Sequence, residues 1–154
     1  MYFMKDVILT VNTIDDLDEI LRVANEIFQP NLQEKEKYFN KSDWADRTIN
    51  GFCISALVDD KVVGFSISYG KEKDLHIWNV GVLDKYRKMG IWHKLYEKTI
   101  EHAIKNNFRS ISLNTYKEKF PDMYNFCQKE GFVEYKTEID SLSGKNKSKF
   151  VKKL

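Results

Sequence analysis

The most informative stretch of the sequence reads Val80-Gly81-Val82-Leu83-Asp84-Lys85-Tyr86-Arg87-Lys88-Met89-Gly90-Ile91. An apolar run typical of a strand ends at Val82, a short polar loop follows, and a long helical pattern begins at Gly90. The first amides of a helix have no carbonyl partner within it, and the helix dipole makes that end positive. Arg87 and Lys88 add two cations beside those amides. We therefore expect an anion-binding site here, and a pyrophosphate is the group that fits it.

The rest of the chain alternates between strand-like and helical patterns. Strands are expected at residues 7–11, 52–58, 62–69, 75–82, 110–115, 132–138 and 149–151. Helices are expected at residues 14–28, within 31–50, at 90–106 and at 121–130, where apolar residues recur every three or four positions. In the helix at 90–106 they form two ridges, Ile91, Leu95, Thr99 and Ala103 beside Trp92, Tyr96, Ile100 and Ile104. The order β-α-α-β-β-β-α-β-α-β-β indicates an α/β protein, and residues 1–154 form one expected domain.

The composition narrows the class of protein. Apolar residues make up 42% of the 154 residues, which excludes a disordered chain, and no run approaches the roughly 18 apolar residues that span a membrane. Two cysteines are too few for a disulfide framework and form no cluster with histidine. We therefore expect a reducing, cytoplasmic location, no membrane partner and no metal site. The 25 basic and 23 acidic residues give a net charge of +2, which favours no particular partner.

Two motifs carry a resemblance to a known family. The first is Arg87-Lys88-Met89-Gly90-Ile91-Trp92, which is similar to an Arg/Gln-x-x-Gly-x-Gly/Ala signature that opens a helix after a strand. The second is Cys127-Gln128-Lys129-Glu130-Gly131-Phe132, which is similar to Tyr-x-x-x-Gly-Phe at the end of a later helix. Together with the order of elements, they make the sequence resemble the GNAT superfamily of acyl-CoA-dependent N-acetyltransferases.

This resemblance implies a fold and an activity. The fold is a central mixed, mostly antiparallel sheet of six to seven strands, flanked by about four helices. The activity is transfer of an acetyl group from acetyl-CoA to a primary amine of a small molecule or peptide, by direct attack in a ternary complex without a covalent acyl-enzyme. The residues implied to hold the coenzyme are Val80, Gly81 and Val82 beside the pantetheine arm, and Arg87, Lys88, Met89, Gly90, Ile91, Trp92 and His93 at the pyrophosphate. Because Trp92 replaces a small residue, we expect its side chain to turn away from the coenzyme.

Three residues are candidates for acid–base chemistry. His76 has an ordinary pKa near neutrality and would take the proton of the amine, with Trp78 on the same face of its strand, or it is an ordinary packed histidine. Cys127 stands where the family often has a tyrosine acid, and it is either a weak proton donor or a small buried residue. Tyr124 lies one turn before it and is the other candidate acid. Asn114 can at most orient a water, because an amide cannot take a proton. His93 and His102 are expected to be solvated.

Other interpretations remain open at this point. Trp92, Phe120 and Cys127 depart from the family pattern, as they would in a GNAT-fold module that binds CoA without turnover. The five lysines of residues 141–154 belong to a solvated edge strand or, as a remote alternative, to a nucleic-acid surface. The acceptor-side segment contains Tyr38, Phe39, Asp43, Trp44 and Asp46, and its two acids either receive a cationic amine or belong to a solvated helix face. A homodimer is left open.

Overall fold

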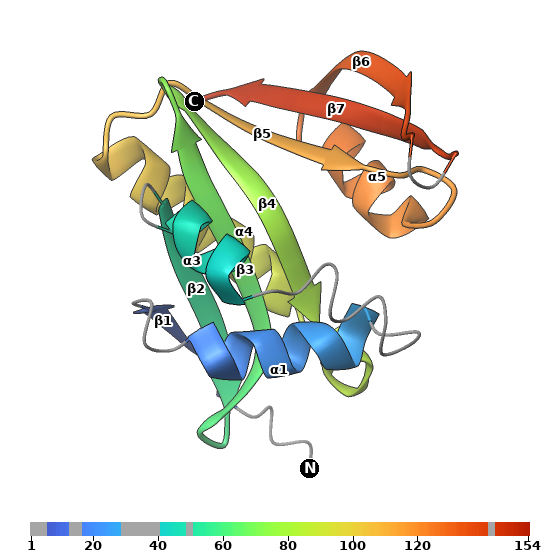
Figure 1. Ribbon diagram of the computed structural model, residues 1–154. Coiled ribbons are helices and arrows are strands. Elements are labelled where there is room, and N and C mark those ends of the chain that lie inside the picture. Colours follow the sequence, from blue (N-terminus) through green and yellow to red (C-terminus); the bar gives the residue numbers. More distant parts are fainter. Residues whose placement is uncertain (1–5, 13–16, 29–40, 49–50, 142–143) are drawn as a thin grey trace.

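The computed structural model describes residues 6–12, 17–28, 41–48, 51–141 and 144–154. Its strands form one sheet in the order β1-β2-β3-β4-β5-β7-β6 (Figure 1). The strands are β1 (Ile8–Asn12), β2 (Gly51–Val58), β3 (Lys61–Lys71), β4 (Asp74–Val82), β5 (Ser110–Thr115), β6 (Val133–Ile139) and β7 (Asn146–Lys153). The helices are α1 (Leu17–Phe28), α3 (Lys41–Thr48), α4 (Ile91–Lys105) and α5 (Pro121–Lys129), with a 3-10 turn η2 (Asp84–Tyr86). The expected mixed α/β fold with a mostly antiparallel sheet is confirmed.

The element bounds depart from the sequence predictions in a few places. The last strand is longer than expected, because β7 pairs with β5 on one side and β6 on the other. The second strand begins one residue earlier than expected, at Gly51, where a Cβ would overlap the Ser68 carbonyl oxygen of the neighbouring strand. Ile104, expected on a buried ridge of α4, is exposed because it lies near the end of the helix, beyond the apolar contacts of the sheet. Tyr38 and Phe39 lie outside the described residues.

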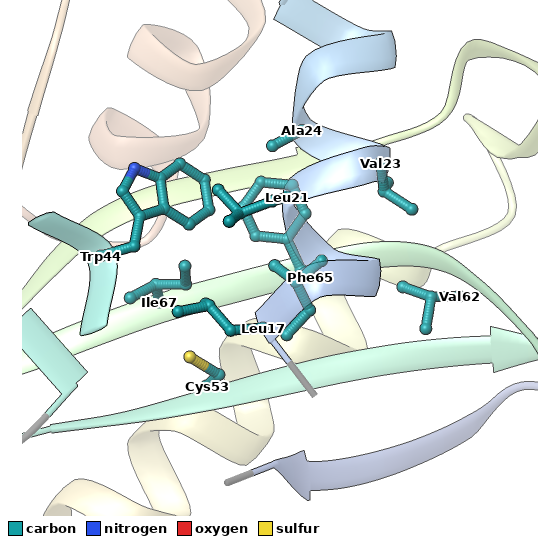
Figure 2. Close-up of a cluster of buried hydrophobic side chains, with 10 residues drawn as sticks. Leu17, Leu21, Val23, Ala24, Trp44, Cys53, Val62, Phe65 and Ile67 are labelled. Carbon is teal, nitrogen blue, oxygen red and sulfur yellow. The ribbon is translucent and has the colours of Figure 1, made fainter. Parts of the chain in front are cut away.

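Helices cover both faces of the sheet. On one face, α1 and α3 pack on β2 and β3 around Phe65 and Ile67, and Figure 2 shows Leu21 of α1 and Trp44 of α3 lying over this cluster. On the other face, α4 and α5 pack on a second set of side chains. Alternate residues of a strand point to opposite faces, so Cys53 joins the first core and Phe52 the second.

Trp44 belongs to the core and not to an acceptor surface. Its side chain is fully buried, and its ring lies 6.0 Å from that of Phe65 and 5.2 Å from that of Trp78. The sequence placed Trp44 in the acceptor-side segment, and in the structure no part of its indole reaches the surface. Asp46, from the same helix, is exposed.

The parallel pair at the centre of the sheet separates after a short contact. β4 and β5 pair only from Asp74 to Ile77 and from Ser110 to Leu113. Beyond these residues β4 continues along β3 and β5 continues along β7, and the two strands diverge (Figure 1). The register between β3 and β4 also shifts here, because Ile77 pairs with Ser68 and Asn79 with Ile67, which leaves Trp78 as an extra residue.

We expect Trp44→Ala to lower the free energy of unfolding by about 3–5 kcal/mol, because truncation of a fully buried indole leaves a cavity in the first core. Ile139→Ala is the matched control, since Ile139 is 71% exposed on β6 and its truncation should change stability by no more than about 0.5 kcal/mol. Urea unfolding followed by circular dichroism measures both. Equal stabilities for the two variants would contradict the placement of Trp44 in the core.

Candidate active site

The start of α4 presents free backbone donors. Gly90 is the N-cap residue and has a left-handed backbone with φ of 74°. The first amide bonded within the helix is that of Lys94, which donates to the Gly90 carbonyl at 3.2 Å, so the amides of Ile91, Trp92 and His93 precede the helical ladder. A Cβ built on Gly90 would meet no atom within 4 Å. An anion can therefore approach this helix terminus closely.

The loop before α4 is fixed to the sheet by its backbone. The Leu83 amide donates to the Val63 carbonyl at 2.9 Å, and the Tyr86 amide donates to the Leu83 carbonyl at 2.8 Å. The Arg87 Nε lies 3.2 Å from the Asp84 carboxylate, and both side chains are mostly exposed. An exposed ion pair of this kind contributes at most about 1 kcal/mol. Arg87 can therefore exchange Asp84 for a phosphate at little cost, and exposed Lys88 adds a second cation.

Trp92 turns away from the helix terminus, as its size requires. Its ring lies 5.2 Å from Phe126 of α5 and 5.9 Å from Tyr96 of α4. The indole thus fills the space between the two helices, while the backbone amide stays in the first turn. The other side chains of this turn diverge: Ile91 is buried under the helix, Met89 packs partly against the same core, and His93 is exposed.

The second half of β4 offers an unpaired edge. Val80, Gly81 and Val82 pair with β3 on one side, but the register with β5 has ended by this point. Backbone groups on the open edge can therefore bond a ligand that lies between the two strands. Gly81 has a separate role, because a Cβ there would lie 2.9 Å from Ile27 Cδ1 and 3.2 Å from Phe65 Cε1. Its lack of a side chain allows α1 to pack directly on the strand.

A pocket of about 380 Å³ opens beside the point where β4 and β5 separate. Its lining includes Tyr69, His76, Ser112, Asn114, Tyr135 and Lys149. His76 Nδ1 lies 2.8 Å from Ser112 Oγ. The Ser112 hydroxyl donates to Asp74 Oδ2 at 2.5 Å, and the Ser110 hydroxyl donates to Asp74 Oδ1 at 2.7 Å. Sequence reasoning found His76 but missed its partners, because only the parallel register aligns Asp74 with Ser110 and His76 with Ser112.

The other two candidates for acid–base chemistry lie together on the opposite face. Cys127 has no exposed surface, and burial raises its pKa to about 12. The Tyr124 hydroxyl donates to Glu134 Oε2 at 2.7 Å, and the bond to this carboxylate is the main cause that raises the pKa of Tyr124. Both side chains join the core between α4, α5 and β7. The burial of Cys127 supports the interpretation that it is a small packed residue, and not that it is a proton donor.

The structure also revises the expectation for His102. Its ring lies 3.9 Å from that of Phe52, so the side chain is half-buried and not solvated. Burial is the main cause that lowers the pKa of His102, with Lys105 and Lys98 acting in the same direction.

Comparison with known proteins identifies the family. The model of the acetyltransferase (GNAT) family matches residues 15–132. The chain belongs to the GNAT family. Among curated proteins, no sequence matches that of this GNAT chain significantly.

Several solved structures share the GNAT fold of this chain. The ribosomal-protein-S18-alanine N-acetyltransferase from Escherichia coli is 12% identical with a TM-score of 0.80, over 96% of this chain and 94% of the other. The PaiA N-acetyltransferase from Thermoplasma acidophilum, in complex with coenzyme A, is 16% identical with a TM-score of 0.77, over 97% and 99%. Ard1 from Thermoplasma volcanium is 19% identical with a TM-score of 0.78, over 96% and 97%.

The GNAT family uses acetyl-CoA as the acetyl donor. The residues of this chain fit that molecule, because the open space at Gly90 leaves room for a phosphate at the amides of α4. Within the described ranges, no three His, Cys, Asp or Glu side chains come together as a metal site would require. None of the described helices has both the length and the apolar character needed to cross a bilayer.

We expect Cys127 to resist thiol reagents in the folded protein. With a pKa of about 12, only about one thiol in ten thousand is ionised at pH 8, and the thiolate is the reactive form. In a Cys53→Ala variant, a disulfide reagent should therefore label no thiol in native conditions and one thiol per chain in denaturant, measured by absorbance. Native labelling faster than global unfolding would contradict the burial of Cys127.

Proposed function

We propose that this GNAT protein is an N-acetyltransferase that acetylates a primary amine of a small molecule or peptide by direct attack in a ternary complex. One observation carries the proposal: β4 runs from a pocket that contains His76 to an unpaired edge at residues 80–82, and the loop after it leads to the open terminus of α4. The helix terminus and the strand edge suit a pyrophosphate and a pantetheine arm. The pocket supplies an imidazole, the side chain whose unperturbed pKa lies nearest to neutral pH.

The coenzyme-binding roles follow from these positions. The amides of residues 91–93, with Arg87 and Lys88, would hold the pyrophosphate. The open edge of β4 at Val80 and Val82 would hold the pantetheine arm and donate a backbone hydrogen bond to the acyl oxygen, an interaction that is worth a few kcal/mol of activation free energy. When bound, acetyl-CoA supplies an activated acyl carbon, which bonds to the amine nitrogen as the carbon–sulfur bond breaks.

His76 would act as the general base. A primary amine such as that of lysine has a pKa of about 10.4 and is therefore protonated at neutral pH. His76 lines the pocket at the point where the strands diverge, so it can take the proton directly or through one water. Asn114 lines the same pocket from β5 and would orient that water.

Proton donation to the leaving group is not assigned to Tyr124 or Cys127. The Tyr124 hydroxyl already donates to Glu134, and the Cys127 thiol is enclosed in the core. A thiol has a pKa of about 8.5, so the CoA thiol can leave as the thiolate without a proton donor. We therefore assign both residues to packing, and the reaction to the residues on the other side of the sheet.

The nucleic-acid alternative finds no support in the lysines of β7. Lys149 lies 3.0 Å from Glu138 in an ion pair, and Lys152 donates to the Tyr96 hydroxyl at 3.2 Å. Two of the four lysines of β7 thus make contacts within the protein. Peptide amines belong in the acceptor panel, because the structural neighbour from Escherichia coli is named for a protein alanine.

The activity itself is tested by release of the CoA thiol from acetyl-CoA over a panel of small-molecule and peptide amines, combined with calorimetry of acetyl-CoA binding. We expect binding together with amine-dependent thiol release for at least one amine. Binding without release for any amine would favour the GNAT-fold module that holds CoA without turnover. No binding would overturn the coenzyme site as well.

The coenzyme site is tested by Gly90→Asp against Gly90→Asn. The two side chains have the same shape, both tolerate the left-handed backbone, and neither meets an atom at Cβ. Only Asp brings a negative charge to the phosphate-binding end of the helix. We expect the Asp variant to bind CoA at least about tenfold more weakly than the Asn variant, a difference of about 1.4 kcal/mol. Equal affinities in two folded variants would refute the assignment.

A further inference from the structure

A chain of hydrogen bonds crosses from β4 to β5 behind His76. His76 Nδ1 lies 2.8 Å from Ser112 Oγ, and Ser112 Oγ donates to Asp74 Oδ2 at 2.5 Å. Ser110 holds the other oxygen of Asp74 at 2.7 Å. The carboxylate is thus fixed through both oxygens, and all four side chains line the same pocket.

The Ser112 hydroxyl lies between His76 and Asp74, and it fixes which group donates in each of the two hydrogen bonds. An ionised carboxylate only accepts hydrogen bonds, so Ser112 must give its single proton to Asp74. Ser112 Oγ can then only accept from the ring, which requires a proton on His76 Nδ1. The neutral imidazole therefore carries its lone pair on Nε2. The same assignment argues against Ser112 as a nucleophile activated by His76, because its proton is committed to Asp74.

We propose that Asp74 and Ser112 are positioning residues, which hold His76 in the Nδ1–H tautomer and stabilise its protonated form during acetyl transfer. This inference rests on the proposed function. His76 first passes the proton of the ammonium group to solvent, which leaves a neutral amine. As that nitrogen bonds to the acyl carbon and the carbon–sulfur bond breaks, the nitrogen loses a second proton, which Nε2 accepts, and CoA leaves as the thiolate. The imidazolium then carries both protons, with Nδ1–H still bonded to Ser112 and Asp74 still ionised. The proton on Nε2 returns to solvent before the next turnover.

Charged groups from several strands face His76. Asp74 on its own strand favours the imidazolium, whereas Lys71 of β3 and Lys149 of β7 oppose it. Tyr69 of β3 has its ring 5.3 Å from that of His76, and Tyr135 of β6 lines the same pocket. Among the described lining residues, Asp74 supplies the negative charge, while Lys149 is itself paired with Glu138 of β6 at 3.0 Å. Removal of Asp74 should therefore make His76 a weaker base.

Nitrogen-15 NMR of the full chain tests the tautomer without any substrate. The chain has three histidines, and loss of a signal in His76→Ala assigns the ring. We expect the Nδ1–H tautomer in the wild type, a mixture of tautomers in Ser112→Ala, and a lower titration midpoint for His76 in Asp74→Asn. The Nε2–H tautomer in the wild type, or an unchanged midpoint in Asp74→Asn, would overturn the proposal.

Steady-state kinetics with an amine from the panel test whether the positioning of His76 affects the rate of acetyl transfer. Ser112→Ala should lower kcat/KM by about tenfold, since a misoriented base loses part of its catalytic effect, and Ser112→Thr should restore it. Asp74→Asn should move the acidic limb of the pH profile to lower pH. Thr137→Ala is the matched control, because it removes a hydroxyl-to-carboxylate bond of 2.7 Å to Glu134 on β6, outside the pocket, and it should change kcat/KM by no more than about twofold.

A double-mutant cycle separates positioning from general destabilisation. On a His76→Ala background, Ser112→Ala should cause no further loss of kcat/KM, because the group that it positions is gone. Additive losses would overturn the proposal. Wild-type protein that turns over no amine would overturn the proposed function instead, and the NMR measurement would still decide the tautomer.

Discussion

The short parallel contact between β4 and β5 is the constraint on which the candidate site depends. Four residues of each strand pair, from Asp74 to Ile77 and from Ser110 to Leu113, and the strands then follow different neighbours. Pairing before this point aligns Asp74, His76 and Ser112 across the two strands. Separation after it leaves one edge of β4 without a strand partner, in front of the start of α4. A longer parallel pair would cover that edge, and a shorter one would lose the alignment.

Much of the fold could be predicted because its local signals agree with its tertiary contacts. The apolar run ending at Val82 and the glycine before α4 correctly gave the strand, the turn and the helix start. Pro121 begins α5, and Gly131 follows that helix with φ of 83°. These residues act through backbone conformation, which depends mainly on near neighbours.

The remaining features depend on contacts between segments that are distant in the sequence. Asp74 and Ser112 are 38 positions apart, and no periodicity indicates that they share a hydrogen bond. The sequence pattern did not place Trp44 in the core, and the packing of α3 on β3 and β4 buries it. His102 lies on the polar face of its helix by sequence pattern, yet Phe52 of β2 extends far enough to stack on it. In all three examples, the length of the side chains and the register of the strands determine which residues meet.

One departure from the family pattern, Trp92, is accommodated by the aromatic cluster between α4 and α5. Trp92 fills that space and packs on Phe126, whereas the site with His76 lies on the face of the sheet that α1 and α3 cover in part. The candidate sites for the two substrates thus open on opposite sides of one sheet and meet only where the strands diverge. The α4 terminus shares no lining residue with the pocket that contains His76, so a substitution at Gly90 leaves the walls of that pocket unchanged.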